Sequence, residues 1–449
     1  MRTDSRQVSR PPGPRGVTAR RAVLGARRDP LGFLVRIWRE YGDVVYFKAG
    51  PFHVYLVSDP DHIRDVLVTN NSKFMKGQGL QEMKRLLGEG LLTSEGELHK
   101  RQRRLIQPMF HHKRIHGYGD VMVERSVRMC ESWKDGQTLD VHQQMMRLTL
   151  SIVAKTLFDT DIEDRDANRV AEALATSLGL FDRVTSPLFQ LFMRVPASPV
   201  MRRFQRAKET LDEIVYGMIR ERRKTGDRGD LLSTLLLAQE EGGEQMNDLQ
   251  VRDEAITIFL AGHETTANAL TWTWYLLSQH PEVQAKLHEE LDTVLGDRPP
   301  TVADLENLPY TQRVLSESMR LYPPAWILGR RALADHEIDG YRIPEGSIVV
   351  AAQYLVHHDS RWFPDPYRFD PDRWLPEQAA SRPKFSYFPF GGGQRLCIGE
   401  PFAWMEGELL LATLAQRWTP RLVRGHPVEL SPVVTLRPKH GMKMTVHAR

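Results

Sequence analysis

Helical periodicity dominates the chain from residue 60 to residue 320, and strand-like alternation lies on both sides of this region. Before it, residues 44–57 form two β-rich runs around a Gly-Pro turn, which predicts a hairpin. After it, residues 327–355 and 420–447 alternate as strands do, and a further helix is predicted over residues 400–418. We find no internal repeat or long linker. The pattern predicts a single domain that is mainly α with a small β portion.

The longest predicted helix runs from Asp248 to Gln279, a stretch without proline that Pro281 closes. Its middle is apolar on nearly every side, which is typical of a membrane span or of the buried axis of a large domain. The centre reads Ala261-Gly262-His263-Glu264-Thr265-Thr266. Because charge at mid-span is costly in a bilayer, the buried axis is favoured. Such polar residues indicate either a satisfied polar network or a site built against the helix, with Gly262 letting a ligand approach the backbone.

Composition places the chain among globular proteins. It has 449 residues, of which 41% are hydrophobic and 26% are charged, and this excludes collagen, coiled-coil arrays and disulfide scaffolds. The net charge of +4 is uneven, because residues 1–28 hold eight Arg and one Asp. A basic tail on a near-neutral body does not indicate a nucleic-acid partner. We expect residues 1–29 to be a flexible basic leader and residues 30–449 to form the domain.

Targeting signals are missing from the first thirty residues, which never contain more than three consecutive apolar residues. A secretory signal needs a longer apolar region, and a membrane anchor needs about 20 such residues. The chain has only two cysteines, Cys130 and Cys397, and so low a count suits a reducing compartment. We therefore expect a cytoplasmic protein without a transmembrane anchor.

Residues 385–401 carry the most specific candidate chemistry. Three consecutive glycines form a tight loop whose backbone can approach a flat ligand, and Cys397 follows at the entrance to the helix over residues 400–418. The helix N-terminus and Arg395 favour a thiolate there. No second Cys or His lies at zinc-ligand spacing, and no His in the segment would activate a nucleophile, so a thiolate bound to haem iron fits best. Cys130, within a helical run, is interpreted as packing.

The pattern Phe390-x-x-Gly393-x-Arg395-x-Cys397-x-Gly399 resembles the haem-binding signature of the cytochrome P450 superfamily. Three more segments resemble its motifs in the same order: Ala261-Gly262-x-Glu264-Thr265-Thr266, Glu317-x-x-Arg320 and Phe369-Asp370-Pro371-Asp372-Arg373-Trp374. The resemblance covers the chain from about residue 30 onward. It implies the single-domain fold of the soluble bacterial members, with a long central helix over haem b.

The resemblance also assigns roles to residues. It implies that Cys397 is the axial ligand of the iron and that Thr265 orients dioxygen, while Glu264 relays protons. Gly262, Phe390 and Arg395 are implied to contact the haem, and its propionates are implied to be held by His99, Arg103 and Arg330. Arg331 is the alternative to Arg330, and the sequence does not separate them. Glu317 and Arg320, joined by Arg373, are implied to lock the loop that carries Cys397.

The function implied is that of a haem-thiolate monooxygenase. It would insert one oxygen atom of dioxygen into a C–H or C=C bond of an apolar small molecule: a terpenoid, a steroid or a fatty acid. No flavin or nicotinamide domain follows Arg449, so we expect electrons from a ferredoxin and its reductase, and we expect a monomer. The basic candidates for docking this partner are Lys100, Arg101, Arg104, Lys113, Arg382 and Lys384.

Apolar segments are expected to line the substrate pocket, and a further set is expected to form a lid. The pocket candidates are Leu86-Leu87, Leu91-Leu92, Phe259, Ala261, residues 325–328 and residues 432–434, and the lid candidates are Phe181, Leu188, Phe189 and Phe192. His357 and His358 are interpreted as ordinary loop histidines. Three alternatives stay open: a peroxide-driven peroxygenase, an isomerase or dehydratase of the same fold, and a haem-based gas sensor or carrier.

Overall fold

The computed structural model describes residues 10–15, 25, 29–161, 169–170, 172–174, 176–177, 179, 198–237 and 246–449. Contacts divide the chain into two compact units. The first comprises Met1–Gln81, Ala325–Arg368 and Pro376–Cys397, and the second comprises Glu82–Pro324, Phe369–Leu375 and Ile398–Arg449. The predicted class, mainly α with a small β portion, is confirmed.

The helices and strands of the first unit follow in chain order: α2 (Pro30–Tyr41), β1 (Val44–Ala49), β2 (Phe52–Val57), α3 (Pro60–Arg64), β3 (Phe74–Lys76), α4 (Gln78–Glu82, ending just beyond the first stretch), β5 (Leu328–Ala332), β6 (His336–Ile338), β7 (Tyr341–Ile343), β8 (Ile348–Ala351), α17 (Gln353–His357) and α18 (Pro376–Ala380).

Those of the second unit are α5 (Lys84–Leu87), α6 (Gly96–Ile106), α7 (His112–His116), α8 (Gly119–Ser132), β4 (Gln137–Asp140), α9 (Val141–Phe158), α12 (Pro199–Thr225), α13 (Leu231–Leu237), α14 (Asp248–Gln279), α15 (Pro281–Leu295), α16 (Pro309–Leu321), α19 (Glu400–Arg417), β9 (Trp418–Leu422), β10 (Leu430–Pro432), β11 (Leu436–Pro438) and β12 (Lys443–Ala448).

A five-stranded sheet in the order β1-β2-β8-β5-β3 organises the first unit. The predicted hairpin is confirmed as β1 and β2, and β2 then pairs in parallel with β8 through Val54 and Ile348. β3 and β8 both pair antiparallel with β5. Apolar side chains from the strands and from the 385–388 segment form its core. The sheet therefore joins segments far apart in the sequence.

Part of the basic leader lies against β1. The amide of Tyr46 donates to the carbonyl of Pro12 at 2.9 Å, and the guanidinium of Arg10 stands over the Tyr46 ring at 4.6 Å. A Cβ on Gly13 would lie 1.9 Å from the Tyr46 carbonyl oxygen, so only glycine allows this approach. The boundary between leader and domain at residue 29 stays a prediction.

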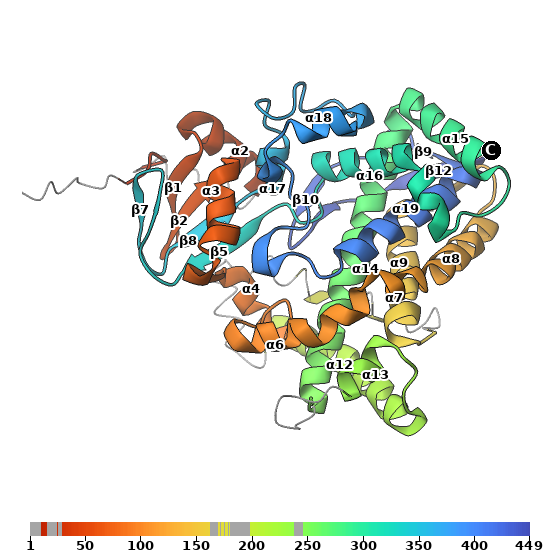
Figure 1. Cartoon of the computed structure of the whole chain (residues 1–449), viewed down its shortest axis with the longest axis horizontal. Coiled ribbons are helices and arrows are strands. Elements are labelled where there is room, and N and C mark those ends of the chain that lie inside the picture. The colour runs from red at the N-terminus through yellow and green to blue at the C-terminus, as the bar shows by residue number, and fades with distance from the viewer. Residues whose placement is uncertain are drawn as a thin grey trace, which may run out of the picture. The chain divides into compact units, whose positions relative to one another are not determined.

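The helix α14 is the axis of the second unit, where it packs against α9, α12, α16 and α19 (Figure 1). Its predicted bounds are confirmed. Asn247 caps its start by accepting the Gln250 amide, and the Gln250 side chain accepts the Asn247 amide in return. Among the described residues, no helix is long and apolar enough to cross a membrane.

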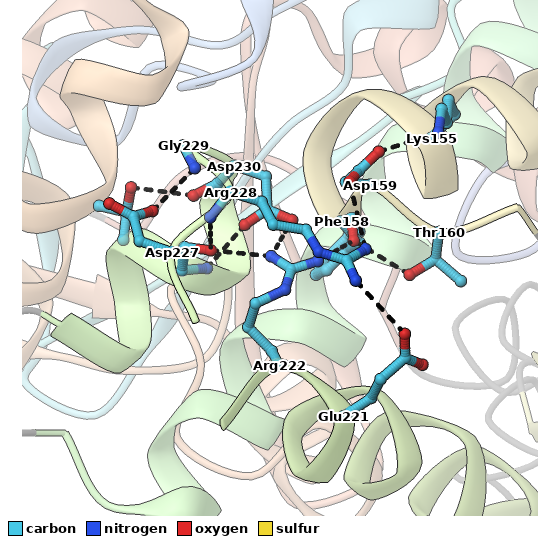
Figure 2. Close-up of polar contacts among 12 residues, drawn as sticks. Lys155, Phe158, Asp159, Thr160, Glu221, Arg222, Asp227, Arg228, Gly229 and Asp230 are labelled. Carbon is cyan, nitrogen blue, oxygen red and sulfur yellow. Dashed lines mark hydrogen bonds and ion pairs between the residues drawn. The ribbon is translucent and has the colours of Figure 1, made fainter. Parts of the chain in front are cut away.

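A buried ion pair joins the ends of α9 and α12 to the start of α13 (Figure 2). Arg222, near the end of α12, pairs with Asp230 and donates to the Phe158 carbonyl at 3.0 Å and to Ser233 at 2.8 Å. Asp230 also accepts the Ser233 amide and caps α13. Because both charges are buried, removing either one would leave the other without its partner. The pair therefore ties the end of α12 to the start of α13.

Buried carboxyl groups on α19 make stability depend on pH. Burial raises the pKa of Glu406 to about 8 and that of Glu408 to about 7. In the unfolded chain these groups ionise near their ordinary pKa of about 4.3. The folded state therefore has its full stability below that value and loses stability as the pH rises through about 8.

We predict that Glu406→Gln removes part of this dependence. Relative to the unmodified protein, the variant should gain roughly 2 kcal/mol between pH 6 and pH 8.5, because the amide cannot ionise. Denaturant unfolding at both pH values measures the difference. Glu124→Gln, at an exposed carboxyl paired with Arg128, serves as the control and should leave the profile unchanged. Parallel profiles for Glu406→Gln and the unmodified protein would contradict the prediction.

Candidate functional site

The cysteine loop of the first unit presents Cys397 as an exposed cysteine that is not part of a disulfide. The amide of Cys397 donates to the Phe390 carbonyl at 3.1 Å, and the amide of Leu396 donates to the Gly393 carbonyl at 3.0 Å. These bonds close residues 390–397 into a ring around a short 3₁₀ turn, Gly393–Arg395. Phe390 and Arg395 are both half-buried in it. The loop thus holds the thiol in a fixed, accessible position.

Two of the three consecutive glycines of this loop are required by contacts within the first unit. Gly393 has a φ of +67°, and a Cβ there would lie 2.0 Å from the carbonyl oxygen of Leu67. A Cβ on Gly392 would lie 2.6 Å from the Phe385 ring. The sequence predicts these glycines as an approach to a flat ligand. In the structure, two of them let the loop pack on its own unit.

His357 is not an ordinary loop residue, which corrects the interpretation from the sequence: it is fully buried at the end of α17. Its Nε2 accepts the amide of Phe388 at 3.1 Å, and its ring stands edge-on to the Phe388 ring. An imidazole that accepts through Nε2 is neutral and carries its proton on Nδ1. His357 therefore supports the segment that leads into the cysteine loop.

The positions of Arg330 and Arg331 on β5 distinguish the two arginines, between which the sequence did not decide. Arg330 is buried and Arg331 is exposed, because successive strand residues point to opposite faces. Arg330 lies directly opposite Lys76 of β3, which is also buried. Two buried cations on one face of a sheet suit an anionic ligand group such as a carboxylate. Sequence reasoning missed Lys76, because nothing in the sequence reveals which strands pair.

A small accessible patch interrupts α14 in the second unit. Between Val251 and Trp274, every residue of the helix is buried except Ala261, Gly262 and Thr265. Thr265 lies three residues after Gly262 and four residues after Ala261, so the three residues share one helix face. The hydroxyl of Thr265 donates to the Ala261 carbonyl at 2.7 Å. The patch combines two small residues with one hydroxyl oxygen, which gives a molecule room to reach the backbone.

Gly262 has a second reason for lacking a side chain. A Cβ there would lie 3.0 Å from a methyl carbon of Val153 on α9, which is tighter than ordinary contact. The glycine therefore serves helix packing, whatever it does on the accessible side.

Glu264 points away from the patch, toward the β10–β11 hairpin. Its Oε1 accepts the Thr435 hydroxyl at 2.5 Å and lies 2.9 Å from Nε of Arg437. The carboxylate is almost completely buried, whereas Arg437 is one-fifth exposed. Arg437 also lines a cavity of about 440 Å³ together with His142 and Lys439. Glu264 thus connects the centre of α14 to this cavity through one arginine.

His99 and Arg103 lie four residues apart on α6, so they share one of its faces as predicted. His99 is buried and Arg103 is half-buried. Lys100 lies between them on an exposed face and pairs with Glu97 at 2.7 Å. The helix therefore has a protected cationic side and a solvated one.

Glu317 and Arg320 form the predicted pair on α16, and both are fully buried. The guanidinium donates two bonds of 2.8 Å, one to each oxygen of Glu317. Arg373 lies 3.3 Å from the same carboxylate. Sequence reasoning missed two further donors, the indole of Trp374 at 3.0 Å and the amide of Asp370 at 3.1 Å.

Other predicted residues have different outcomes. Cys130 is confirmed as packing, since it is buried and burial raises the pKa of its thiol to about 12. Phe259 is buried and stacks on Phe158 at 4.3 Å, and it lines a small apolar cavity together with Leu211 and Ile256. The predicted lid residues lie outside the described residues, as does the side chain of Lys113.

Comparison with known proteins decides the family. A model of the cytochrome P450 family matches residues 11–445. The chain belongs to the cytochrome P450 family. It is 40% identical over 419 residues to cyclooctatin synthase of Streptomyces melanosporofaciens, covering 92% of this chain and 90% of that protein.

Two further P450 relatives carry names that state a reaction. Cyclooctat-9-en-7-ol 5-monooxygenase of Streptomyces melanosporofaciens is 40% identical, covering 89% of this chain and 86% of that protein. Pentalenene oxygenase of Streptomyces avermitilis is 38% identical, covering 87% of each. This P450 is therefore an oxidoreductase, a haem monooxygenase that uses dioxygen and electrons from redox partners.

We predict that Glu317→Ala destabilises this P450 severely. The change leaves two buried guanidinium groups without their carboxylate, which costs roughly 3–5 kcal/mol. Thermal unfolding and the yield of haem-loaded protein measure the loss. Lys286→Ala, at an exposed pair with Asp372, is the matched control and should have little effect. Normal stability of Glu317→Ala would show that the carboxylate is dispensable.

Proposed function

We propose that this P450 binds haem b through the thiolate of Cys397. The exposed thiol in a loop closed by backbone hydrogen bonds fits an axial ligand, whereas Cys130 is buried and protonated. When bound, the haem supplies the chemistry of dioxygen activation, and a thiolate ligand favours cleavage of the O–O bond, as it does throughout the P450 family. The chain's own residues hold the group and control what reaches it.

The propionates are proposed to bind buried or half-buried cationic residues. Arg330 and Lys76 suit one carboxylate, because they are buried side by side. His99 and Arg103 offer a second protected pair of donors on α6. Arg395 and Phe390 are proposed to contact the haem from the cysteine loop.

Oxygen binding is proposed to take place at the patch of Ala261, Gly262 and Thr265. This patch is the observation that carries the proposal, because it is accessible on a helix that is otherwise buried from Val251 to Trp274. The Thr265 hydroxyl would orient the oxygen by hydrogen bonding. Glu264 would receive protons from solvent through the cavity that Arg437 lines, with Arg437 holding its carboxylate in place.

The substrate is proposed to be a cyclic terpenoid, which is oxidised by insertion of one oxygen atom. Support comes from the three relatives, whose names include a terpenoid oxygenase and a terpenoid alcohol monooxygenase. Electrons are proposed to come from a ferredoxin and its reductase, in the cytoplasm, to a monomeric enzyme. A panel of cyclic terpene hydrocarbons, fatty acids and steroids, tested by optical titration of the haem, separates the three substrate classes.

Turnover of the enzyme with purified electron-transfer partners distinguishes the monooxygenase from a peroxygenase. Product formation with ferredoxin, reductase, reduced nicotinamide and dioxygen supports the monooxygenase. Turnover with hydrogen peroxide and none with the electron-transfer chain would favour a peroxygenase and contradict the proposed partner.

We predict that Cys397→Ser abolishes the red-shifted absorption band of the reduced carbon monoxide complex, because the thiolate ligand is lost. Cys130→Ser is the matched control and should keep the band, since that thiol is buried in packing. Absorption difference spectra of both variants test the assignment. An intact band in Cys397→Ser would require another axial ligand.

We predict that Thr265→Ala uncouples electron uptake from product formation. The variant keeps the thiol loop and the cations, so substrate affinity should change little. Without the oriented hydroxyl, the ratio of product to reduced nicotinamide should fall by about tenfold or more, with hydrogen peroxide released instead. Thr266→Ala, at the neighbouring buried threonine, is the control. An unchanged ratio in Thr265→Ala would make its bond to Ala261 purely structural.

Glu264→Gln should behave differently from Thr265→Ala. It leaves the hydroxyl in place but breaks the ionic contact with Arg437. Turnover should slow with less peroxide release, because protons arrive late while the local donor is intact.

A further inference from the structure

The loop Gly88–Leu92 is bound to the first half of α14 through two adjacent buried carboxyl groups. Asp253 accepts the amide of Glu89 at 2.8 Å, and Glu254 accepts the amide of Leu91 at 2.9 Å. Glu254 is completely buried, and Asp253 is 5% exposed. Acidic side chains are almost never fully buried unless they are paired. Here each carboxyl group accepts one backbone amide of the loop.

The loop is shaped to accept these groups. Gly88 has a φ of +60°, and a Cβ there would lie 1.9 Å from a carboxylate oxygen of Asp253. A Cβ on Gly90 would lie 2.2 Å from the Thr257 hydroxyl oxygen. The loop backbone therefore approaches α14 closely at two points where only glycine fits. On its other side, the Gln102 side chain donates to the Glu89 carbonyl at 2.6 Å.

Arg252 extends the same contact to α12. Its Nη1 donates to Asp253 at 2.8 Å and its Nε donates to Asp212 at 2.6 Å. Arg252 is buried, whereas Asp212 is about one-quarter exposed. A continuous chain of charge-assisted bonds thus runs from the loop through α14 to α12. The 88–92 loop and α12 are therefore both bound to α14 through the buried pair of Arg252 and Asp253.

We propose that Asp253 and Glu254 are positioning residues that clamp the 88–92 loop onto α14 and thereby shape the wall of the substrate pocket. The identity of that wall rests on the proposed function and on the expectation from the sequence that Leu91 and Leu92 line the substrate pocket. Leu91 follows Gly90 directly, so a shift of the clamp moves its side chain. The acids touch the loop backbone, so they position the wall rather than contact the substrate.

The protonation of Glu254 determines which substitution is the fair control. Burial raises its pKa to about 8, so the carboxyl is mostly neutral near pH 7. Its Oε2 accepts the Leu91 amide, and glutamine offers a neutral oxygen of the same reach. Glu254→Gln should therefore preserve the clamp, whereas Glu254→Leu keeps the bulk and removes the acceptor.

Amide hydrogen exchange on the haem-loaded enzyme tests the clamp directly. In Glu254→Leu, the Leu91 amide should exchange about tenfold faster or more, because a buried hydrogen bond has been removed. In Glu254→Gln, its rate should stay within about threefold of the unmodified enzyme. Asp248→Asn changes an exposed acid on the same helix and should leave the loop unaffected. Unchanged exchange at Leu91 in Glu254→Leu would overturn the clamp.

A second measurement tests the effect on the pocket. The product ratio from one cyclic sesquiterpene hydrocarbon, with ferredoxin and reductase, should change in Glu254→Leu and in Asp253→Ala, but not in Glu254→Gln. Faster exchange at Leu91 with an unchanged product ratio would overturn the link to the pocket. Failure of the unmodified enzyme to oxidise any terpene, with a normal carbon monoxide band, would count against the proposed substrate class, and the exchange experiment would still decide the clamp.

Discussion

The second unit depends most heavily on the ion pairs and hydrogen bonds of the buried Glu317 carboxylate. A charge without solvent is stable only when donors surround it, and here they come from α16 itself and from the short stretch of residues 369–375. That stretch lies far along the chain from α16 and contains only one short 3₁₀ helix, Pro371–Trp374. The carboxylate therefore does what a strand pairing or a helix interface does elsewhere: it fixes a short segment in one place.

The helix α14 shows the same principle at several positions along its length. Near its start, Asp253 and Glu254 bind a loop. At its centre, Glu264 binds the β10–β11 hairpin, and the accessible patch that includes Thr265 lies beside it. A buried helix can carry polar residues only where a particular partner meets each one. Each of these acids is accordingly matched to a different backbone or side-chain partner, and between Val251 and Trp274 only Ala261, Gly262 and Thr265 are left accessible.

Features that depend only on neighbouring residues in the chain, such as helix ends, could be predicted from the sequence. The bounds of α14 follow from its cap at Asn247 and from Pro281, and both are visible in the sequence. The partner of Arg330, by contrast, is Lys76, and this pairing exists only through the register of β3 on β5. The role of His357 likewise depends on a distant segment that brings an amide to its ring. Such contacts are properties of the fold, so no pattern in one stretch reveals them.

The motifs mark the family correctly, but the physical reason for a motif residue can differ from the one that the sequence suggests. The glycines of the cysteine loop mark a haem protein, yet Gly393 is required because a carbonyl of the same unit occupies the space of its side chain. Similarly, a side chain on Gly262 would press against Val153 of α9. A residue type can be diagnostic of a function while its immediate cause is packing, and only the structure separates the two.

The parallel pairing of β2 with β8 has a consequence for how this protein is made. Val54 finds its partner Ile348 only after roughly 300 further residues have left the ribosome, which takes about 15–60 seconds at ordinary rates of synthesis. During that time the β1–β2 hairpin has an apolar face and an open edge that can pair with other chains. The nascent protein must therefore be shielded until its last third emerges, and its yield in a cell should respond to chaperone supply more than that of a protein whose sheet is built from neighbouring strands.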